Sequence, residues 1–307
     1  ELKRAREDPL FLACGIFRPH MPWEVPQKYF DMYPLDEIPD LEVMENDLED
    51  ALVHPRRGWH KFVLENKQWK NVIQAYLASI SFADAQVGRL LDALEESGKA
   101  DETIVVLWSD HGMHIGEKEN WEKFTLWEES THVPLFVKAP GVSKPGSLVT
   151  QPVSLLDLYP TLVDLSGFDV PGHCDGASVV PLLEDSKAVR EHSALTSFTY
   201  PGNKTGHGLR GNRFRYIYYE WNSLEELYDH DSDPHEFTNL AYDEQYSGVV
   251  ERFRNEMASR VSRVSLDDMS RWPVNYTVFE GRISADGFVP MAQVPLLKER
   301  PKTVGIR

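Results

Sequence analysis

Apolar runs alternate along the chain with polar, proline-containing segments. Residues 10–17, 103–108 and 133–137 are nearly continuous apolar runs of strand length. Strands buried on both faces of a parallel sheet show this pattern. Between the first two runs, residues 66–97 place apolar side chains at helical spacing, and Gly98 suits the position that ends a helix. The order strand, helix, strand predicts a parallel α/β sheet.

The C-terminal part of the chain has a different pattern. Residues 154–166 predict one more short helix, and short strands with a covering amphipathic helix follow. The strands are residues 194–198, 214–220 and 226–229, and the helix is residues 246–261. We predict two parts, an α/β portion over 1–190 and a smaller α+β subdomain over 191–307. Residues 265–307 show no pattern that predicts an element.

Composition narrows the classes of function. The chain of 307 residues has a formal net charge of -17, which argues against a nucleic-acid-binding surface. No apolar run is long enough for a membrane span. An anionic substrate would need a local group of cations, or a metal, against this background field. The two cysteines, Cys14 and Cys174, predict no disulfide framework, and Cys14 is expected to be a buried thiol.

Titratable side chains directly follow two of the predicted strands. Arg18 and His20 lie in a segment that two prolines make stiff and non-helical. Asp110, His111 and Lys123 lie in the polar segment after the second strand. Ligand sites in parallel α/β sheets lie beyond the carboxyl ends of the strands. We therefore expect these side chains to gather at the rim of a dry core, where charges interact strongly.

The adjacent Asp110 and His111 suggest a cation site, because Gly112 permits a sharp turn that aims both side chains at one point. The carboxylate suits Ca²⁺ or Mg²⁺, whereas the imidazole favours Zn²⁺. Taken alone, the pair also fits a turn in which Asp110 is a cap. His20 taken alone fits a packed loop residue, Lys123 a solvated lysine and His132 a strand-edge residue.

Five segments together resemble the sulfatase family of the alkaline phosphatase superfamily, most closely its iduronate-2-sulfatase-like branch. They are residues 12–22, 109–134, 157–162, 226–229 and 233–241, in the family's order and spacing. The resemblance runs from about Leu10 to Ala241. It implies an alkaline-phosphatase-like, mostly parallel sheet flanked by helices, with a smaller C-terminal subdomain built from an antiparallel sheet and a helix.

The resemblance assigns roles to single residues. Asp110 and His111 would be two ligands of a divalent ion, usually Ca²⁺ in this family, with Mg²⁺ as the alternative. Lys123 would hold a sulfate oxygen and the leaving oxygen, and His20 would help to protonate the leaving alkoxide. Such groups oppose the negative charge that develops during ester cleavage. Further candidates for substrate binding are Arg18, His114, His132 and Arg210.

The family's nucleophile is a formylglycine made from Cys or Ser within C/S-x-P/A-x-R. Cys14 has Arg18 four residues on, but Ile16 stands where Pro or Ala is required. Cys174 lacks the arginine. The resemblance therefore implies that the formylglycine belongs to an N-terminal portion of the same enzyme, which would be the partner of this chain.

These expectations define a function. The resemblance implies hydrolysis of sulfate esters, on a sulfated polysaccharide such as a glycosaminoglycan, in a secreted, periplasmic or lysosomal setting. One alternative is a phosphoester or phosphonate hydrolase of the alkaline phosphatase superfamily. The other is a non-catalytic fragment that only binds glycans. For this chain alone we expect no sulfatase activity.

Overall fold

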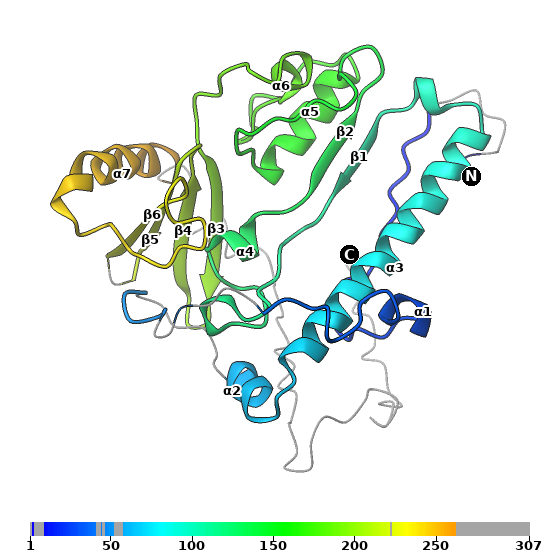
Figure 1. The fold of residues 1–307 in the computed structure, drawn as a ribbon. Helices are drawn as coiled ribbons and strands as arrows, with labels where there is room; N and C mark the ends of the chain where they lie inside the picture. The colour runs from blue at the N-terminus through cyan, green and yellow to red at the C-terminus, as the bar shows by residue number, and fades with distance from the viewer. Residues whose placement is uncertain are drawn as a thin grey trace, which may run out of the picture.

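The computed structural model describes residues 2, 9–40, 44, 47–51, 58–221 and 223–261. Its helices and strands form two groups, which Figure 1 shows on either side of the short helix α4. The helices are α1 (Gln27–Phe30), α2 (Gly58–Glu65), α3 (Trp69–Glu96), α4 (Glu128–Thr131), α5 (Leu158–Leu165), α6 (Val180–Glu184) and α7 (Ser247–Val261). The strands are β1 (Val105–Trp108), β2 (Leu135–Lys138), β3 (Ala194–Tyr200), β4 (Lys204–Arg210), β5 (Phe214–Tyr219) and β6 (Leu224–Asp229).

The long helix α3 matches its prediction closely. It ends at Glu96, and Gly98 has a φ of +71°, the left-handed conformation that glycine adopts without strain. Helix α1 packs against α3, where the rings of Tyr29 and Phe82 meet edge to face at 5.5 Å. Figure 1 shows α3 lying beside β1, on the side away from β3.

Strands β1 and β2 pair antiparallel, with Val105 opposite Lys138 and Trp108 opposite Leu135. The prediction of a parallel pairing is therefore wrong for these strands. Every strand pair within the described residues is antiparallel. The strand-helix-strand pattern failed because it took the first predicted strand, residues 10–17, as a neighbour of β1.

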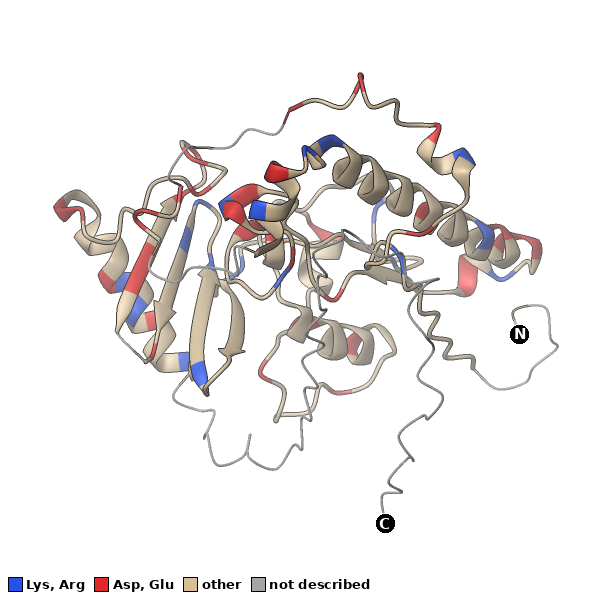
Figure 2. Cartoon of the chain, turned by 90° about the horizontal axis from the view of Figure 1, so that it is seen from below, with Lys and Arg blue, Asp and Glu red and all other residues tan. Residues whose placement is uncertain are grey.

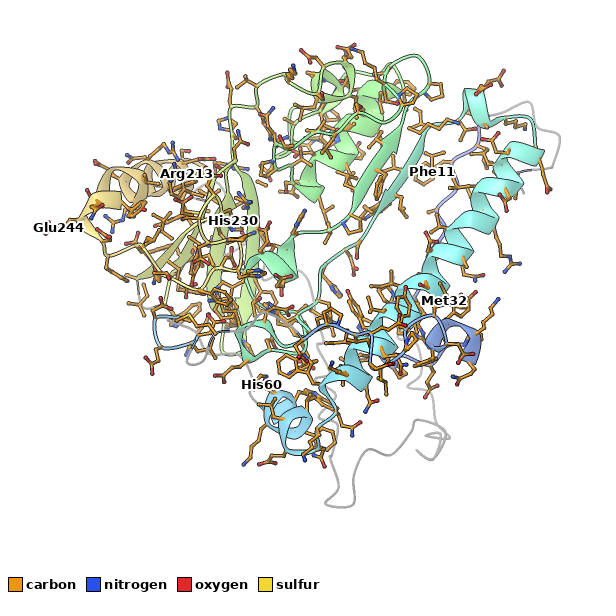
Figure 3. All side chains as sticks on the ribbon, viewed as in Figure 1. Phe11, Met32, His60, Arg213, His230 and Glu244 are labelled. Atoms are coloured by element: carbon orange, nitrogen blue, oxygen red, sulfur yellow. The ribbon has the colours of Figure 1, made fainter. Side chains whose placement is uncertain are left out.

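Residues 10–17 are extended but are not assigned to a strand. Phe11 is 86% exposed, and Cys14 is exposed instead of buried as predicted. Figure 3 shows the Phe11 side chain on this extended segment. A strand needs a neighbour to satisfy its backbone groups, and the described residues supply none here. The predicted strands at β1 and β2 form, but Trp108 and Phe136 are exposed and not fully buried.

The C-terminal group is a four-stranded antiparallel sheet in the order β3-β4-β5-β6. Three of these strands were predicted, and β4 was missed because glycines at 206 and 208 break its apolar pattern. Helix α7 covers one face of the sheet. The ring of Phe253 stacks on Tyr216 at 5.7 Å, and the cluster around them is buried. The predicted covering helix is therefore confirmed.

The other face of this sheet packs against the segment that precedes α4. Leu126 and Trp127 are buried there with Ile217 and Tyr228. A Cβ atom on Gly206 would lie 3.0 Å from the Cδ1 atom of Leu126, so the glycine permits close contact. The sheet thereby holds the chain a few residues downstream of Lys123.

Figure 2 shows acidic residues spread over helices and connecting segments alike, in keeping with the net charge of -17. Among the described residues, no helix is both long enough and apolar enough to cross a membrane.

Candidate active site

The loop after β1 places Asp110 and His111 at the mouth of the site. The Ser109 hydroxyl donates a hydrogen bond to the carbonyl oxygen of His111 at 2.8 Å, which fixes the turn. The Gly112 amide donates to the carbonyl oxygen of Ser130 at 2.9 Å. A Cβ atom on Gly112 would lie 2.0 Å from the carbonyl oxygen of Glu129. Glycine is required here because the backbone of α4 packs directly onto the loop.

Asp110 and His111 present ligand atoms toward each other. The Asp110 Oδ2 atom lies 3.8 Å from the His111 Nε2 atom. His111 Nδ1 donates to the Gly112 carbonyl at 2.7 Å, so Nε2 keeps its lone pair for a metal or a substrate. The Asp110 side chain is 84% exposed and therefore accessible. This oxygen and nitrogen fit two ligands of one divalent cation.

His20 and Lys123, separated by 103 positions in the chain, are in direct contact. The His20 Nε2 atom lies 2.7 Å from the Lys123 Nζ atom. His20 Nδ1 donates to the carbonyl oxygen of Met21 at 2.7 Å, which leaves Nε2 as the acceptor for the ammonium. The rings of His20 and His111 lie edge to face with centroids 6.2 Å apart. The residues predicted on two separate loops thus meet in one place.

The loop of His20 is held rigidly by its own side chains. Trp23 Nε1 donates to the Pro19 carbonyl at 2.7 Å, and Arg18 donates to the Glu24 carbonyl at 3.1 Å. Both X-Pro bonds in the loop, Arg18–Pro19 and Met21–Pro22, are cis. Arg18 was predicted to bind substrate, but its guanidinium is engaged within this loop.

The surroundings of Lys123 shift the pKa of its ammonium group. Desolvation lowers the pKa of Lys123 below its usual value, and the negative charges of Glu122 and Asp110 partly oppose that shift. The residue that follows, Phe124, has a φ of +76° and lies with its ring 5.2 Å from the Lys123 Nζ atom. The ammonium is therefore placed between an aromatic face, an imidazole and two carboxylates.

His114 is not a substrate-binding residue, contrary to the prediction. Its side chain is fully buried, and its Nε2 atom bonds the Thr125 hydroxyl at 2.8 Å. Burial lowers the pKa of His114 to about 4, so the ring is neutral. Because the His114 ring has no exposed surface, it packs against the segment that carries Lys123 and does not contact substrate. Nothing in the sequence distinguished His114 from its exposed neighbours.

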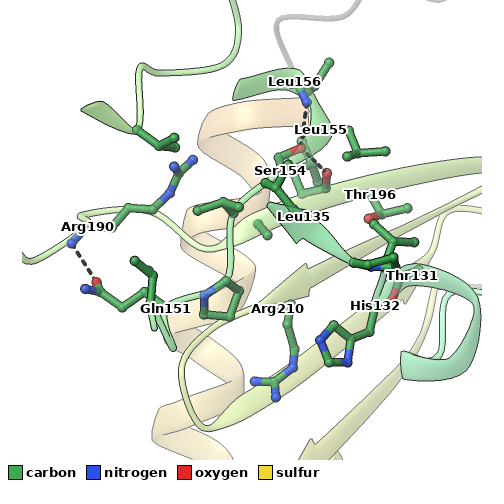
Figure 4. Close-up of a pocket in the computed structure, with 18 of the residues that line it drawn as sticks. Thr131, His132, Leu135, Gln151, Ser154, Leu155, Leu156, Arg190, Thr196 and Arg210 are labelled. Carbon is green, nitrogen blue, oxygen red and sulfur yellow. Dashed lines mark hydrogen bonds between the residues drawn. The ribbon is translucent and has the colours of Figure 1, made fainter. Parts of the chain in front are cut away.

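His132 and Arg210 lie together on another wall of the same cavity (Figure 4). The His132 side chain is 75% exposed, and its Nδ1 atom lies 3.4 Å from Glu128 Oε1. Arg210 Nε donates to Glu128 Oε2 at 3.1 Å. Glu128 thus ties two predicted substrate residues together. The cavity has a volume of about 2010 Å³, and its lining includes Asp110, His111 and Lys123.

A second group of metal-ligating side chains lies behind this wall. Glu128, His230 and Glu236 each offer one ligand atom, and these three atoms lie within 4.8 Å of one another. Figure 3 shows His230 within the C-terminal sheet group. The guanidinium of the buried Arg215 already occupies this group, since its Nε atom lies 2.5 Å from Glu236 Oε1 and it also contacts Glu128. The arginine supplies the positive charge, so the group is an ion-pair network and not a metal site.

Comparison with known proteins shows the family to which the chain belongs. The sequence model of the Sulfatase family matches residues 1–168, and the model described as N-sulphoglucosamine sulphohydrolase, C-terminal, matches residues 116–263. The chain belongs to the sulfatase family. A sulfatase from Formosa agariphila is 38% identical over 258 residues, which is 81% of this chain and 49% of that protein. The chain thus spans about half the length of this relative.

Solved structures show the same fold. A phosphonate monoester hydrolase of Agrobacterium radiobacter matches with a TM-score of 0.68 and 26% identity, covering 80% of this chain and 55% of that one. A protein crystallised with its substrate D-glucosamine-2-N,6-O-disulfate matches with a TM-score of 0.58 and 28% identity, covering 67% and 44%. These similarities confirm the predicted α/β fold class.

Proposed function

We propose that this chain forms the metal-binding and leaving-group half of an enzyme that hydrolyses sulfate esters on sulfated carbohydrates. The contact between His20 and Lys123, at 2.7 Å and beside Asp110 and His111, carries the proposal. It joins two loops whose chemistry matches the bond to be cleaved. The sulfatase and the sulfated-sugar complex among the matched proteins support the substrate class.

The charge of each side chain determines its role in the proposed reaction. The Lys123 ammonium binds a sulfate oxygen, and this electrostatic interaction becomes stronger as negative charge moves to the bridging oxygen. His20 Nε2 accepts from the Lys123 ammonium, so a proton can pass from Lys123 Nζ through His20 Nε2 to the departing alkoxide. Its Nδ1–H bond to Met21 orients the ring for that transfer. His132 and Arg210 line the same cavity and would contact the sugar.

Asp110 and His111 would hold a divalent ion, Ca²⁺ or alternatively Mg²⁺, which polarises the sulfate oxygens when bound. Their geometry fits, because Oδ2 and Nε2 face each other at 3.8 Å. The formylglycine nucleophile would be supplied by an N-terminal portion of the same enzyme. We infer a secreted, periplasmic or lysosomal setting from the family.

The branch of the family is also part of the proposal. Human iduronate 2-sulfatase is 31% identical over 235 residues, 62% of this chain and 42% of that protein. Arg210 already donates from Nε to Glu128 and from Nη1 to backbone carbonyls, so its Nη2 group would be the donor to an anionic sugar such as a uronate. Other sulfatases match at similar identity, so this assignment rests on the Arg-Pro-His-Met-Pro segment, residues 18–22.

Replacing Lys123 or His20 by alanine tests the proposal in the enzyme that combines this chain with its N-terminal portion. Each change is expected to lower kcat for a sulfated monosaccharide by about 100- to 1,000-fold, because each removes a group that acts on transition-state charge. Lys61→Ala, at an exposed lysine on α2, is the matched control and keeps full activity. Near-normal turnover in Lys123→Ala or His20→Ala would remove that residue from the mechanism.

A second candidate is hydrolysis of phosphonate monoesters, which two of the solved structures are named for. The matched structures cover 80% of this chain, so its fold alone does not separate the reactions. A sulfate ester and a phosphonate ester of the same alcohol separate them by the ratio of kcat/KM. We expect the sulfate ester to be the better substrate. A higher kcat/KM for the phosphonate would favour the second candidate.

A further inference from the structure

Three polar side chains on the C-terminal sheet form a connected hydrogen-bond chain that sulfate hydrolysis does not use. Ser197 of β3 lies directly opposite His207 of β4. The Ser197 Oγ atom lies 2.8 Å from His207 Nδ1, and His207 Nε2 lies 2.9 Å from Glu220 Oε1. Ser197 is exposed, the Glu220 side chain is 37% exposed and the His207 side chain is 7% exposed. The hydroxyl can therefore meet a ligand while the imidazole is held.

The direction of these hydrogen bonds follows from the groups themselves. The Glu220 carboxylate can only accept, so His207 donates from Nε2 and keeps its lone pair on Nδ1. That lone pair faces the Ser197 hydroxyl. A hydroxyl bonded to an imidazole that a carboxylate orients is the arrangement of an activated nucleophile.

The sheet edge adds backbone donors beside the hydroxyl. Ser154 Oγ donates to the Leu195 carbonyl at 3.3 Å, so the polar groups of Leu195 point away from β4. Backbone polar groups alternate in direction along an antiparallel edge strand, so those of Ser197 and Thr199 point the same way. The amide groups of Ser197 and Thr199 thus face the free edge of β3, where an oxyanion could bind.

This constellation is separate from the site of Lys123. Gly206 and Gly208 lie on the sheet face that packs against Leu126, as a Cβ atom on either would contact that side chain. His207 stands between them and therefore projects from the opposite face. Residues of both faces line the large cavity, which extends around the edge strand β3.

We propose that Ser197, His207 and Glu220 form a second hydrolytic site, which cleaves short-chain carboxylic esters. Ser197 Oγ attacks the ester carbonyl and its proton passes to His207 Nδ1. The carbon–alkoxide bond breaks, the alkoxide leaves with that proton, and an acyl-serine remains. Water then attacks the acyl-serine, giving up a proton to His207, and releases the carboxylic acid and the free Ser197 hydroxyl. Atoms balance with water as the only co-reactant.

A fluorophosphonate probe on the purified wild-type protein tests the site directly, followed by peptide mass spectrometry. We expect the label on Ser197, with burst kinetics on p-nitrophenyl acetate. Ser197→Ala and His207→Gln should each lower the hydrolysis rate by about 100-fold or more, and Glu220→Gln by less. Ser166→Ala is the matched control, since it removes an exposed serine hydroxyl at the end of α5 without touching Ser197, His207 or Glu220.

A chelator distinguishes this site from the proposed sulfate site. In the enzyme that combines this chain with its N-terminal portion, EDTA should abolish sulfate ester cleavage but leave acetate ester cleavage and the labelling unchanged. Labelling of another residue, no labelling, or an unchanged rate in Ser197→Ala would overturn the proposal. The three side chains would then be a structural bridge between strands. Either result leaves the sulfate ester proposal standing, because Lys123 and His20 test that separately.

Discussion

At the scale of single residues, Lys123 is the cation that the proposed function requires in a chain with a net charge of -17. Partial burial lowers the pKa of the Lys123 ammonium, whereas the negative charges of Glu122 and Asp110 favour its charged form. Its contact with His20 Nε2 directs it toward the cavity mouth. A bound divalent ion would lower the pKa of Lys123 further in the same direction. The proposed binding of an anion therefore depends on local charge and not on the overall field.

The charge of Glu122 should set the alkaline limit of activity. In the proposed mechanism Lys123 acts as a cation, so activity should be present below its pKa in the folded enzyme and be lost as the pH rises through that value. Glu122 raises this pKa, so Glu122→Gln should move the alkaline limb of kcat/KM to lower pH. The pH profile of the assembled enzyme measures this. Glu95→Gln on α3 serves as the control, and a limb that moves upward or stays in place would contradict the role of Lys123.

At the scale of elements, the four-residue helix α4 is the joint between the site and the C-terminal sheet. The Ser130 carbonyl of α4 accepts a hydrogen bond from the Gly112 amide, in the loop of Asp110 and His111. Glu128 of α4 contacts Arg215, which also donates to the Leu126 carbonyl at 3.0 Å. Arg215 and its other partner, Glu236, are each 2% exposed. Strand β5 therefore anchors the segment that follows Lys123 and packs against the loop of Asp110.

Removing Arg215 should cost far more stability than removing an exposed lysine. Arg215→Met leaves Glu128 and Glu236 without their buried counter-charge, which costs about 3–5 kcal/mol of unfolding free energy. Lys61→Met breaks the 3.7 Å ion pair between Lys61 and Glu65, whose side chains are 74% and 62% exposed. This change should alter the free energy of unfolding by less than about 0.5 kcal/mol. Urea unfolding of both variants measures the difference. Equal midpoints would show that the network is not a stabilising joint.

At the scale of the whole molecule, large apolar side chains remain exposed where the α/β portion should have a core. Phe11, Trp108, Phe136, Leu148 and Phe168 are between 47% and 86% exposed. An isolated two-stranded sheet such as β1-β2 is marginally stable in water. We infer that the N-terminal portion of the enzyme covers these surfaces and supplies strand neighbours for residues 10–17.

This inference predicts the behaviour of the chain by itself. The 307-residue chain alone should bind the dye ANS and self-associate in size-exclusion chromatography, because exposed apolar patches drive association. Co-expression with the N-terminal portion should suppress both effects and yield sulfatase activity. Phe136→Lys on β2 should weaken dye binding of the lone chain, whereas Val189→Lys, at an exposed residue outside both sheets, should not. A monomeric lone chain that binds no dye would contradict the inference.

Local order was open to prediction from the sequence wherever it depends on local physics. The spacing of apolar residues predicted α3 and α7, and Gly98 marked the end of α3. The cluster of Asp110, His111, Lys123 and His20 was expected because polar residues follow strand-like runs. The resemblance of segments 12–22 and 109–134 to the sulfatase family assigned their roles, which stay predictions.

The tertiary structure alone decided which partners those residues have. Strand pairing depends on long-range contacts, so β1 and β2 could be recognised as strands while their antiparallel pairing could not. Burial depends on neighbours in space, which separated the buried His114 from the exposed His132 and left residues 10–17 exposed. The alignment of Ser197, His207 and Glu220 depends on the register of β3, β4 and β5. Local periodicity depends on residues that are close together in the sequence, whereas register and burial depend on packing between segments that are far apart in the chain.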